Sequence, residues 1–283
     1  MKLVSYRHQA KHSLALLIDN SLYDLAHLHD GQWSDMKALL ADTDALAALA
    51  GAEHRVSPED GIALGDVTLL PPIERPGKVI CIGKNYAEHA REGGSEPPDY
   101  PMLFHKAATS LVGYQGDVVM PGISHKIDFE GELAVVIGRD CKSVGEDEAL
   151  DYVFGYTVAN DVTARDWQKR TSQFTAGKML DTFCPLGPAV VSKDEIADVQ
   201  NLRLTTHLNG EKMQDGNTKD MVFSVAFLVS YISQICTLEV GDLILTGTPE
   251  GVGFARKPPV WMKAGDRVRV EVEGLGVLEN PVV

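Results

Sequence analysis

The chain has 283 residues, of which 44% are hydrophobic and 23% charged, a composition typical of a globular protein with a substantial buried core. Its formal net charge of -14 and the absence of any Lys/Arg block argue against a nucleic acid or an anionic membrane as partner, since both attract basic surfaces. The four cysteines are widely separated and lack zinc-site spacing, which favours reduced thiols in a cytoplasmic protein.

The N-terminal residues 1–72 are expected to form a small α/β subdomain. The runs LALLID and LYDLA predict two strands joined by a turn, and the Ala/Leu-rich segment 35–50 predicts a helix. The start of the chain lacks the apolar run and cleavage site of a signal peptide. A Pro- and Gly-rich loop at 68–78 then leads into the remainder of the chain.

Residues 73–283 are expected to form the second, larger domain. Short apolar runs that predict strands lie at 78–83, 132–138, 153–160, 186–191, 202–210, 242–247 and 267–283. Few helical segments separate them, so the pattern predicts an α+β, β-rich mixed-sheet fold and not repeated βαβ units. The apolar stretch 221–236 is shorter than the ~20 residues of a membrane span and predicts a buried helix.

A short helix is predicted within ICIGKNYAEHAREGG. Asn85 and Glu88 resemble a capping box, and Gly93 and Gly94 would end the helix. His89 and Glu92 would then share one face, where the carboxylate raises the basicity of the imidazole for taking a proton from water. The alternative for this pair is an ordinary surface contact. The glycines and the following prolines suggest a movable lid.

Three acidic residues alternate in KIDFEGEL, directly before the apolar run AVVIG. On one continuous strand Asp128, Glu130 and Glu132 would face the same way and would need a cation to offset their repulsion. The alternative is an edge strand with a solvated acidic face.

The segment VFGYTVANDVTARDWQ predicts a strand that ends at Asn160 and a helix that begins at Asp161. Asp161, Arg165 and Gln168 would share one face of this helix, although Asp161 could equally be a simple helix cap and its pairing with Arg165 a surface contact. If Glu130, Glu132 and Asp161 meet in space, their oxygen atoms suit Mg²⁺ or Mn²⁺, with Ca²⁺ as a further candidate.

Two later segments add polar groups. Lys178 follows a glycine in a mostly uncharged segment, where an ammonium group could stabilise an enolate or oxyanion, or could simply be solvated. The turn LTGTPEGVG lacks the pattern of a nucleotide-binding loop, but its backbone amides and Thr248 could bind a substrate carboxylate.

Five segments in this order, GKNYAEHARE, DFEGELAVVIG, GYTVANDVTARDWQ, GKMLDTFCPLGP and LTGTPEGVG, resemble the motif set of the fumarylacetoacetate hydrolase family. The segments DWQ, DTFCPLGP and RKPPV are especially similar to the branch called fumarylacetoacetate hydrolase domain-containing protein 2. The resemblance implies that residues 73–283 are the catalytic domain and that Glu130, Glu132 and Asp161 are metal ligands. It also implies that His89 and Glu92 activate water. Lys178 would polarise the substrate, and Arg165, Gln168 and Thr248 would contact it.

The resemblance further implies a homodimeric enzyme that acts on a small anionic 2-oxo acid. We expect metal-dependent hydrolysis of a carbon–carbon bond in an acylpyruvate such as fumarylpyruvate or maleylpyruvate, in the catabolism of aromatic compounds. The alternatives are an oxaloacetate decarboxylase or tautomerase, or a 2-hydroxyhepta-2,4-diene-1,7-dioate isomerase. A non-catalytic homologue with a structural metal site is the remaining alternative.

Overall fold

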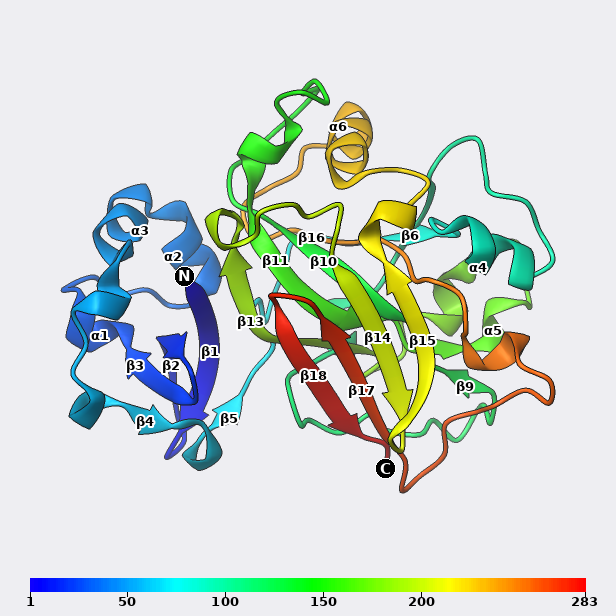
Figure 1. Ribbon diagram of the computed structural model, residues 1–283, viewed down its shortest axis with the longest axis horizontal. Helices are drawn as coiled ribbons and strands as arrows, with labels where there is room; N and C mark the ends of the chain where they lie inside the picture. Colours follow the sequence, from blue (N-terminus) through cyan, green and yellow to red (C-terminus); the bar gives the residue numbers. More distant parts are fainter.

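The N-terminal part of the computed structural model, which describes residues 1–283, combines short strands with short helices (Figure 1). Its elements are β1 (Lys2–His8), β2 (Lys11–Ile18), β3 (Ser21–Asp24), α1 (Leu25–Leu28), α2 (Met36–Ala41), α3 (Thr43–Leu49), β4 (Ile62–Ala63) and β5 (Thr68–Leu69). The two predicted strands are therefore present, but β1 was not predicted. The segment 35–50 is helical, as predicted, but it forms two helices and not one, because Asp42 ends α2 and its side chain caps α3 by accepting a hydrogen bond from Ala45.

The remainder of the chain is rich in strands, as predicted. It contains β6 (Val79–Gly83), α4 (Ala87–Glu92), β7 (Met102–His105), β8 (Leu111–Val112), β9 (Ile127–Asp128), β10 (Gly131–Ile137), β11 (Val153–Asn160), β12 (Thr163–Ala164), α5 (Arg165–Gln168), β13 (Cys184–Ser192), β14 (Arg203–Leu208), β15 (Glu211–Asn217), α6 (Val225–Ile235), β16 (Leu243–Leu245), β17 (Arg267–Val272) and β18 (Gly276–Pro281). The α+β class with few helices is confirmed.

Most strands belong to one mixed sheet of twelve strands, in which β1 pairs with β13 and β11, β10, β16, β6 and β7 follow in order. The β1–β13 pair joins the N-terminal strands to the rest of the sheet. Only β16 with β6 and β13 with β8 run parallel; the other pairs are antiparallel. A second sheet has the order β15-β14-β17-β18 and crosses in front of β10 and β11 in Figure 1.

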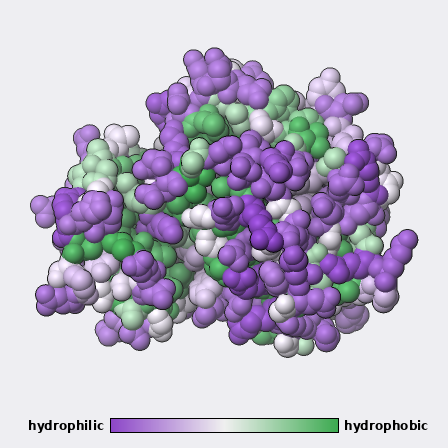
Figure 2. Space-filling model, viewed as in Figure 1, coloured by the Kyte–Doolittle hydropathy of each residue, from purple (hydrophilic) through white to green (hydrophobic).

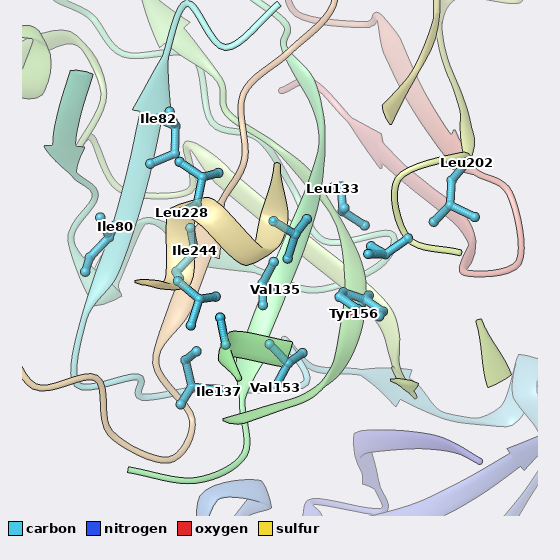
Figure 3. Packing of buried hydrophobic residues seen from close by; sticks show 14 of the residues in the cluster. Ile80, Ile82, Leu133, Val135, Ile137, Val153, Tyr156, Leu202, Leu228 and Ile244 are labelled. Carbon is cyan, nitrogen blue, oxygen red and sulfur yellow. The ribbon is translucent and has the colours of Figure 1, made fainter. Parts of the chain in front are cut away.

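The central strands bury both of their faces. Along β10, Leu133 and Val135 point to a core shared with α6 and the second sheet, as Figure 3 shows for Val135 and Leu228. Ala134 and Val136 point instead to a core closed by the N-terminal helices. This explains why β10 reads as a continuous apolar run without alternation.

The helix predicted within 221–236 is α6, an amphipathic helix of 11 residues packed on the core. No helix in the structure has both the length and the apolar character that crossing a bilayer would require. Figure 2 shows that hydrophilic residues cover most of the visible face, with smaller hydrophobic patches between them.

Candidate active site

The acidic segment is not one continuous strand, contrary to the prediction. β9 ends at Asp128 and β10 begins at Gly131, because the Glu130 N–H donates to the Asn160 side chain (2.9 Å) and not to a backbone carbonyl of a neighbouring strand. The Glu130 carbonyl in turn accepts a hydrogen bond from the Asp161 N–H (2.8 Å). This exchange places the residue after β11 directly against the interrupted strand.

Three buried carboxylates converge at this junction. One oxygen each of Glu130, Glu132 and Asp161 lies within 4.8 Å of the other two. Glu132 is held by the Gly247 N–H, which donates to its Oε2 at 2.8 Å. Such a cluster of oxygen ligands has the chemistry that hard divalent cations require.

Three buried cations surround the carboxylates. Lys178 Nζ lies 2.6 Å from Glu130 Oε2 and 2.7 Å from Asp161 Oδ2. Arg165 pairs with Asp128 at 2.8 Å and with Glu130 at 2.5 Å. Lys106, which follows β7, lies 2.5 Å from Asp161 Oδ1 and also donates to the Val162 carbonyl. Lys106 was not predicted, since a single lysine at the end of an apolar strand carries no local signal.

The charges of this cluster fit a divalent cation. Four buried carboxylates, those of Asp128, Glu130, Glu132 and Asp161, face only the three buried cations, so one negative charge is unbalanced. Burial, followed by repulsion from Asp161 and Glu130, raises the pKa of Glu132 well above its usual value. A bound cation would remove this strain and stabilise the charged carboxylate.

The cations also fix the charge of their own partners. Burial alone would raise the pKa of Glu130, but Arg165 and Lys178 hold it below its usual range. Burial likewise opposes the charged form of Lys178, but Asp161 and Glu130 raise the pKa of its ammonium group. Lys178 is thus a charged donor in a dry site, which is the first of the two possibilities that the sequence left open.

The predicted helix from Asp161 is wrong. Thr163 and Ala164 form β12, which pairs with β9, and α5 starts only at Arg165. The strand pair competes with helix formation and overrides the capping preference of Asp161. Arg165 and Gln168 still lie together, with Nη1 of the arginine donating to Oε1 of the glutamine at 3.1 Å.

The predicted His89–Glu92 pair is present on α4, with 2.8 Å between His89 Nδ1 and Glu92 Oε1. The capping box is absent, because the Asn85 side chain instead bonds to Phe223 and Thr246. Contact of Nδ1 with the carboxylate favours the tautomer with hydrogen on that nitrogen, which leaves a lone pair on Nε2.

The Gly-rich turn 245–253 holds the protein's own carboxylates. The N–H groups of Gly247, Gly251 and Gly253 donate to Glu132, Glu92 and Asp128, respectively, at 2.8, 2.8 and 2.7 Å. These amides are therefore not free for a substrate carboxylate. The Thr248 hydroxyl donates to the Gly131 carbonyl and accepts from Gln214, so it offers only an acceptor.

A pocket of about 200 Å³ brings most of the predicted residues together. Its wall includes His89, Glu130, Glu132, Arg165, Gln168, Lys178 and Thr248. Glu92 and Asp161 are not part of this wall but directly contact residues that are. The wall further contains the rings of Phe104, Phe174 and Phe254, and Arg165 stacks 4.4 Å from the centre of the Phe254 ring.

Comparison with known proteins finds a family match and close relatives. The sequence pattern described as "Fumarylacetoacetate (FAA) hydrolase C-terminal" matches residues 78–283. The mitochondrial oxaloacetate tautomerase FAHD2A of Homo sapiens is 50% identical over 220 residues, which cover 77% of this chain and 70% of the relative. A fumarylacetoacetate hydrolase domain-containing protein 2 homolog of Dictyostelium discoideum is 41% identical and covers 100% of this chain and 97% of its own.

Solved structures of similar fold cover the whole chain. A fumarylacetoacetate hydrolase from Exiguobacterium antarcticum has a TM-score of 0.86 at 37% identity, with coverage of 100% of this chain and 99% of its own. A 2-hydroxyhepta-2,4-diene-1,7-dioate isomerase from Mycobacterium marinum has a TM-score of 0.79 at 36% identity, with coverage of 100% of this chain and 98% of its own. A maleylpyruvate hydrolase from Sphingobium sp. SYK-6 has a TM-score of 0.83 at 31% identity, with coverage of 100% of this chain and 99% of its own.

Proposed function

Because the chain belongs to the fumarylacetoacetate hydrolase family, we propose that it is a metal-dependent oxaloacetate tautomerase, which interconverts the enol and keto forms of this 2-oxo diacid. The observation that carries the proposal is the convergence of a hard-cation ligand set, a buried ammonium and a carboxylate-supported imidazole at one pocket. The 50% identity to an oxaloacetate tautomerase supports this alternative over the carbon–carbon hydrolase expected from the motifs.

Glu130, Glu132 and Asp161 would hold Mg²⁺ or Mn²⁺, which when bound supplies a Lewis acid for the oxygen atoms of the 2-oxo acid. Two of the three N–H groups of the Lys178 ammonium donate to Glu130 and Asp161, and the third can donate to an oxygen of the substrate. The Gln168 side chain lines the pocket, and its Nε2 has no partner in the protein. Both groups can orient the substrate and stabilise negative charge on its enolate oxygen.

Tautomerisation moves one proton between the C2 oxygen and C3. His89 lines the pocket, and its Nε2 is the basic atom left by the contact of Nδ1 with Glu92. In the keto-to-enol direction Nε2 takes a proton from C3, and the imidazolium then returns a proton to the enolate oxygen, which regenerates the neutral imidazole; in the reverse direction Nε2 takes the proton of the enol hydroxyl and delivers it to C3. Glu92, fixed by the Gly251 N–H, keeps the imidazole oriented for this transfer.

A second candidate is hydrolysis of an acylpyruvate. The maleylpyruvate hydrolase of similar fold and the intact His89–Glu92 pair favour it, because the same imidazole could take a proton from water. The homodimer that the family resemblance implies and the cytoplasmic location that the cysteine usage favours are part of the same proposal.

The test follows the ultraviolet absorbance of enol-oxaloacetate with Mg²⁺ or Mn²⁺ present, and release of pyruvate from maleylpyruvate in parallel. We expect the protein to accelerate ketonisation, and His89→Gln to lose about 10²- to 10⁴-fold in kcat. Glu92→Gln should lose activity to a smaller extent, because its amide can still contact Nδ1. Cleavage of maleylpyruvate without any effect on oxaloacetate would overturn the tautomerase assignment in favour of the hydrolase.

A further inference from the structure

Two lysines on the wall of the pocket have no anionic partner. Lys84 and Lys169 both line the pocket, and neither forms an ion pair or donates a side-chain hydrogen bond within the protein. The deeper cations Lys106, Arg165 and Lys178 are all paired.

The two lysines lie nearer to solvent than the carboxylate cluster. Lys84 is partly buried and Lys169 is exposed, whereas Glu130 and Glu132 are buried. Lys84 follows β6 and precedes α4, and Lys169 follows α5, so both flank helices that lie on the same side of the molecule in Figure 1. They therefore mark the outer part of the pocket, and the acidic cluster marks its inner part.

Local structure keeps both lysines at this place. Lys84 has a φ of +59°, which lies in the left-handed region. Residues other than glycine rarely adopt this conformation, so the surrounding fold must enforce it. The Nζ of Lys169 lies 4.8 Å from the centre of the Phe254 ring, whose other contact is the Arg165 guanidinium. The Phe254 ring thus contacts the buried Arg165 of the inner cluster and the exposed Lys169 at the outer part of the pocket.

The charge of the whole pocket points to the ligand. With the carboxylates in their charged forms, as a bound cation requires, the wall and the residues linked to it by salt bridges or hydrogen bonds hold five carboxylates and five cations: Asp128, Glu130, Glu132, Asp161 and Glu92, against Lys84, Lys106, Arg165, Lys169 and Lys178. A divalent cation at the inner end would leave two positive charges, which a dicarboxylate neutralises and a monocarboxylate does not.

We propose that Lys84 and Lys169 form a subsite for the second carboxylate of a dicarboxylate 2-oxo acid, and that they select such diacids over 2-oxo acids with an uncharged end. The inference rests on the proposed function for the position of the first carboxylate, at the inner end. The outer carboxylate of a short diacid then extends towards the two ammonium groups.

The test compares Lys84→Met, Lys169→Met and the double variant with the parent protein. Methionine keeps the length of an apolar stem and removes the charge. Lys11→Met, an exposed lysine of β2 that does not line the pocket, is the matched control for net charge. Lys84→Arg and Lys169→Arg keep the charge and should retain the properties of the parent.

Binding of oxaloacetate and of 2-oxobutanoate, which has a methyl group in place of the outer carboxylate, is measured by calorimetry with Mn²⁺ present. The double variant should bind oxaloacetate about 10-fold more weakly and 2-oxobutanoate within about 2-fold of the parent. For turnover of oxaloacetate the loss should fall on KM, with kcat nearly unchanged.

Equal weakening for both acids, or no weakening for oxaloacetate, would overturn the subsite. The outcome is separable from that of the proposed function, because binding is read without turnover. A parent protein that prefers oxaloacetate through the two lysines but does not tautomerise it would retain the subsite and lose only the proposed reaction.

Discussion

At the scale of single residues, Lys106 has the most testable role. Both Lys106 and Asp161 side chains are fully buried, and without Lys106 the Asp161 carboxylate keeps only Lys178, which it shares with Glu130. We expect Lys106→Met to lower the free energy of unfolding by about 3 kcal/mol in the presence of a chelator. Urea unfolding measures this, with exposed Lys11→Met as control, expected within about 0.5 kcal/mol of the parent. Equal stability of both variants would contradict the account.

Asp266 provides a test of pH dependence away from the pocket. Burial alone would raise its pKa, but hydrogen bonds from Asn209 and the Lys263 N–H lower it below its usual value. A lowered pKa in the folded state contributes stability above the unfolded-state pKa, which is lost as pH falls through the folded-state value.

We therefore expect Asp266→Asn to be less stable than the parent near neutral pH, with a difference that shrinks below about pH 4. Unfolding by urea at a series of pH values measures the difference. A gap between parent and variant that stays constant down to acid pH would show that the charge of Asp266 is not its source.

The sequence was sufficient to predict which residues form the candidate site, but not which residues contact one another. The carboxylates that form the ligand set were chosen from their types and from a resemblance, and they do converge. Lys106 and the backbone amides of the turn at 245–253 were missed as partners of carboxylates. Their contacts join residues more than 50 positions apart, as for Lys106 and Asp161, and no local pattern encodes such pairs.

At the scale of elements, the position of Lys178 depends on a close approach of two short helical segments. Gly177 ends the turn Phe174–Gly177, and a Cβ on it would lie 2.5 Å from the Gln168 nitrogen and 2.6 Å from the Ala164 carbonyl oxygen. Both are backbone atoms of the α5 region, so neither can give way without moving that segment.

Gly177→Ala should therefore destabilise the protein by about 1 to 3 kcal/mol and weaken binding of 2-oxo acids, since Lys178 and Gln168 both shift. Gly122→Ala is the matched control, because a Cβ there meets nothing within 4 Å. Thermal unfolding and ligand titration measure the two effects. If the two alanine variants behaved alike, close packing at Gly177 would not be what positions the lysine.

Elements were predicted well where burial alone decides them. The strands β6, β10, β11 and β16 consist mostly of apolar residues, and such short apolar runs predict strands in the buried centre of a sheet. The segment after Asn160 was assigned wrongly, since its short pairing with β9 is a tertiary effect that overrides local helix signals. The first strand, β1, was missed because it has polar residues at both ends and because its partner strand β13 is distant in the sequence.

At the scale of the whole molecule, the assembly state is open to a direct test. The monomer has a mass of 30.7 kDa, and the resemblance to the family implies a homodimer. Sedimentation equilibrium should therefore give about 61 kDa, twice the 30.7 kDa of one chain. A particle with the mass of a single chain across micromolar concentrations would refute the dimer.

The central claim is that Glu130, Glu132 and Asp161 together bind one hard divalent cation. Crystals grown with Mn²⁺ and measured at the manganese absorption edge locate such an ion by its anomalous scattering. We predict one strong peak in contact with these three carboxylates, and no peak there for Glu132→Gln crystals prepared in the same way. Absence of the peak in the parent protein, or a peak elsewhere only, would contradict the claim.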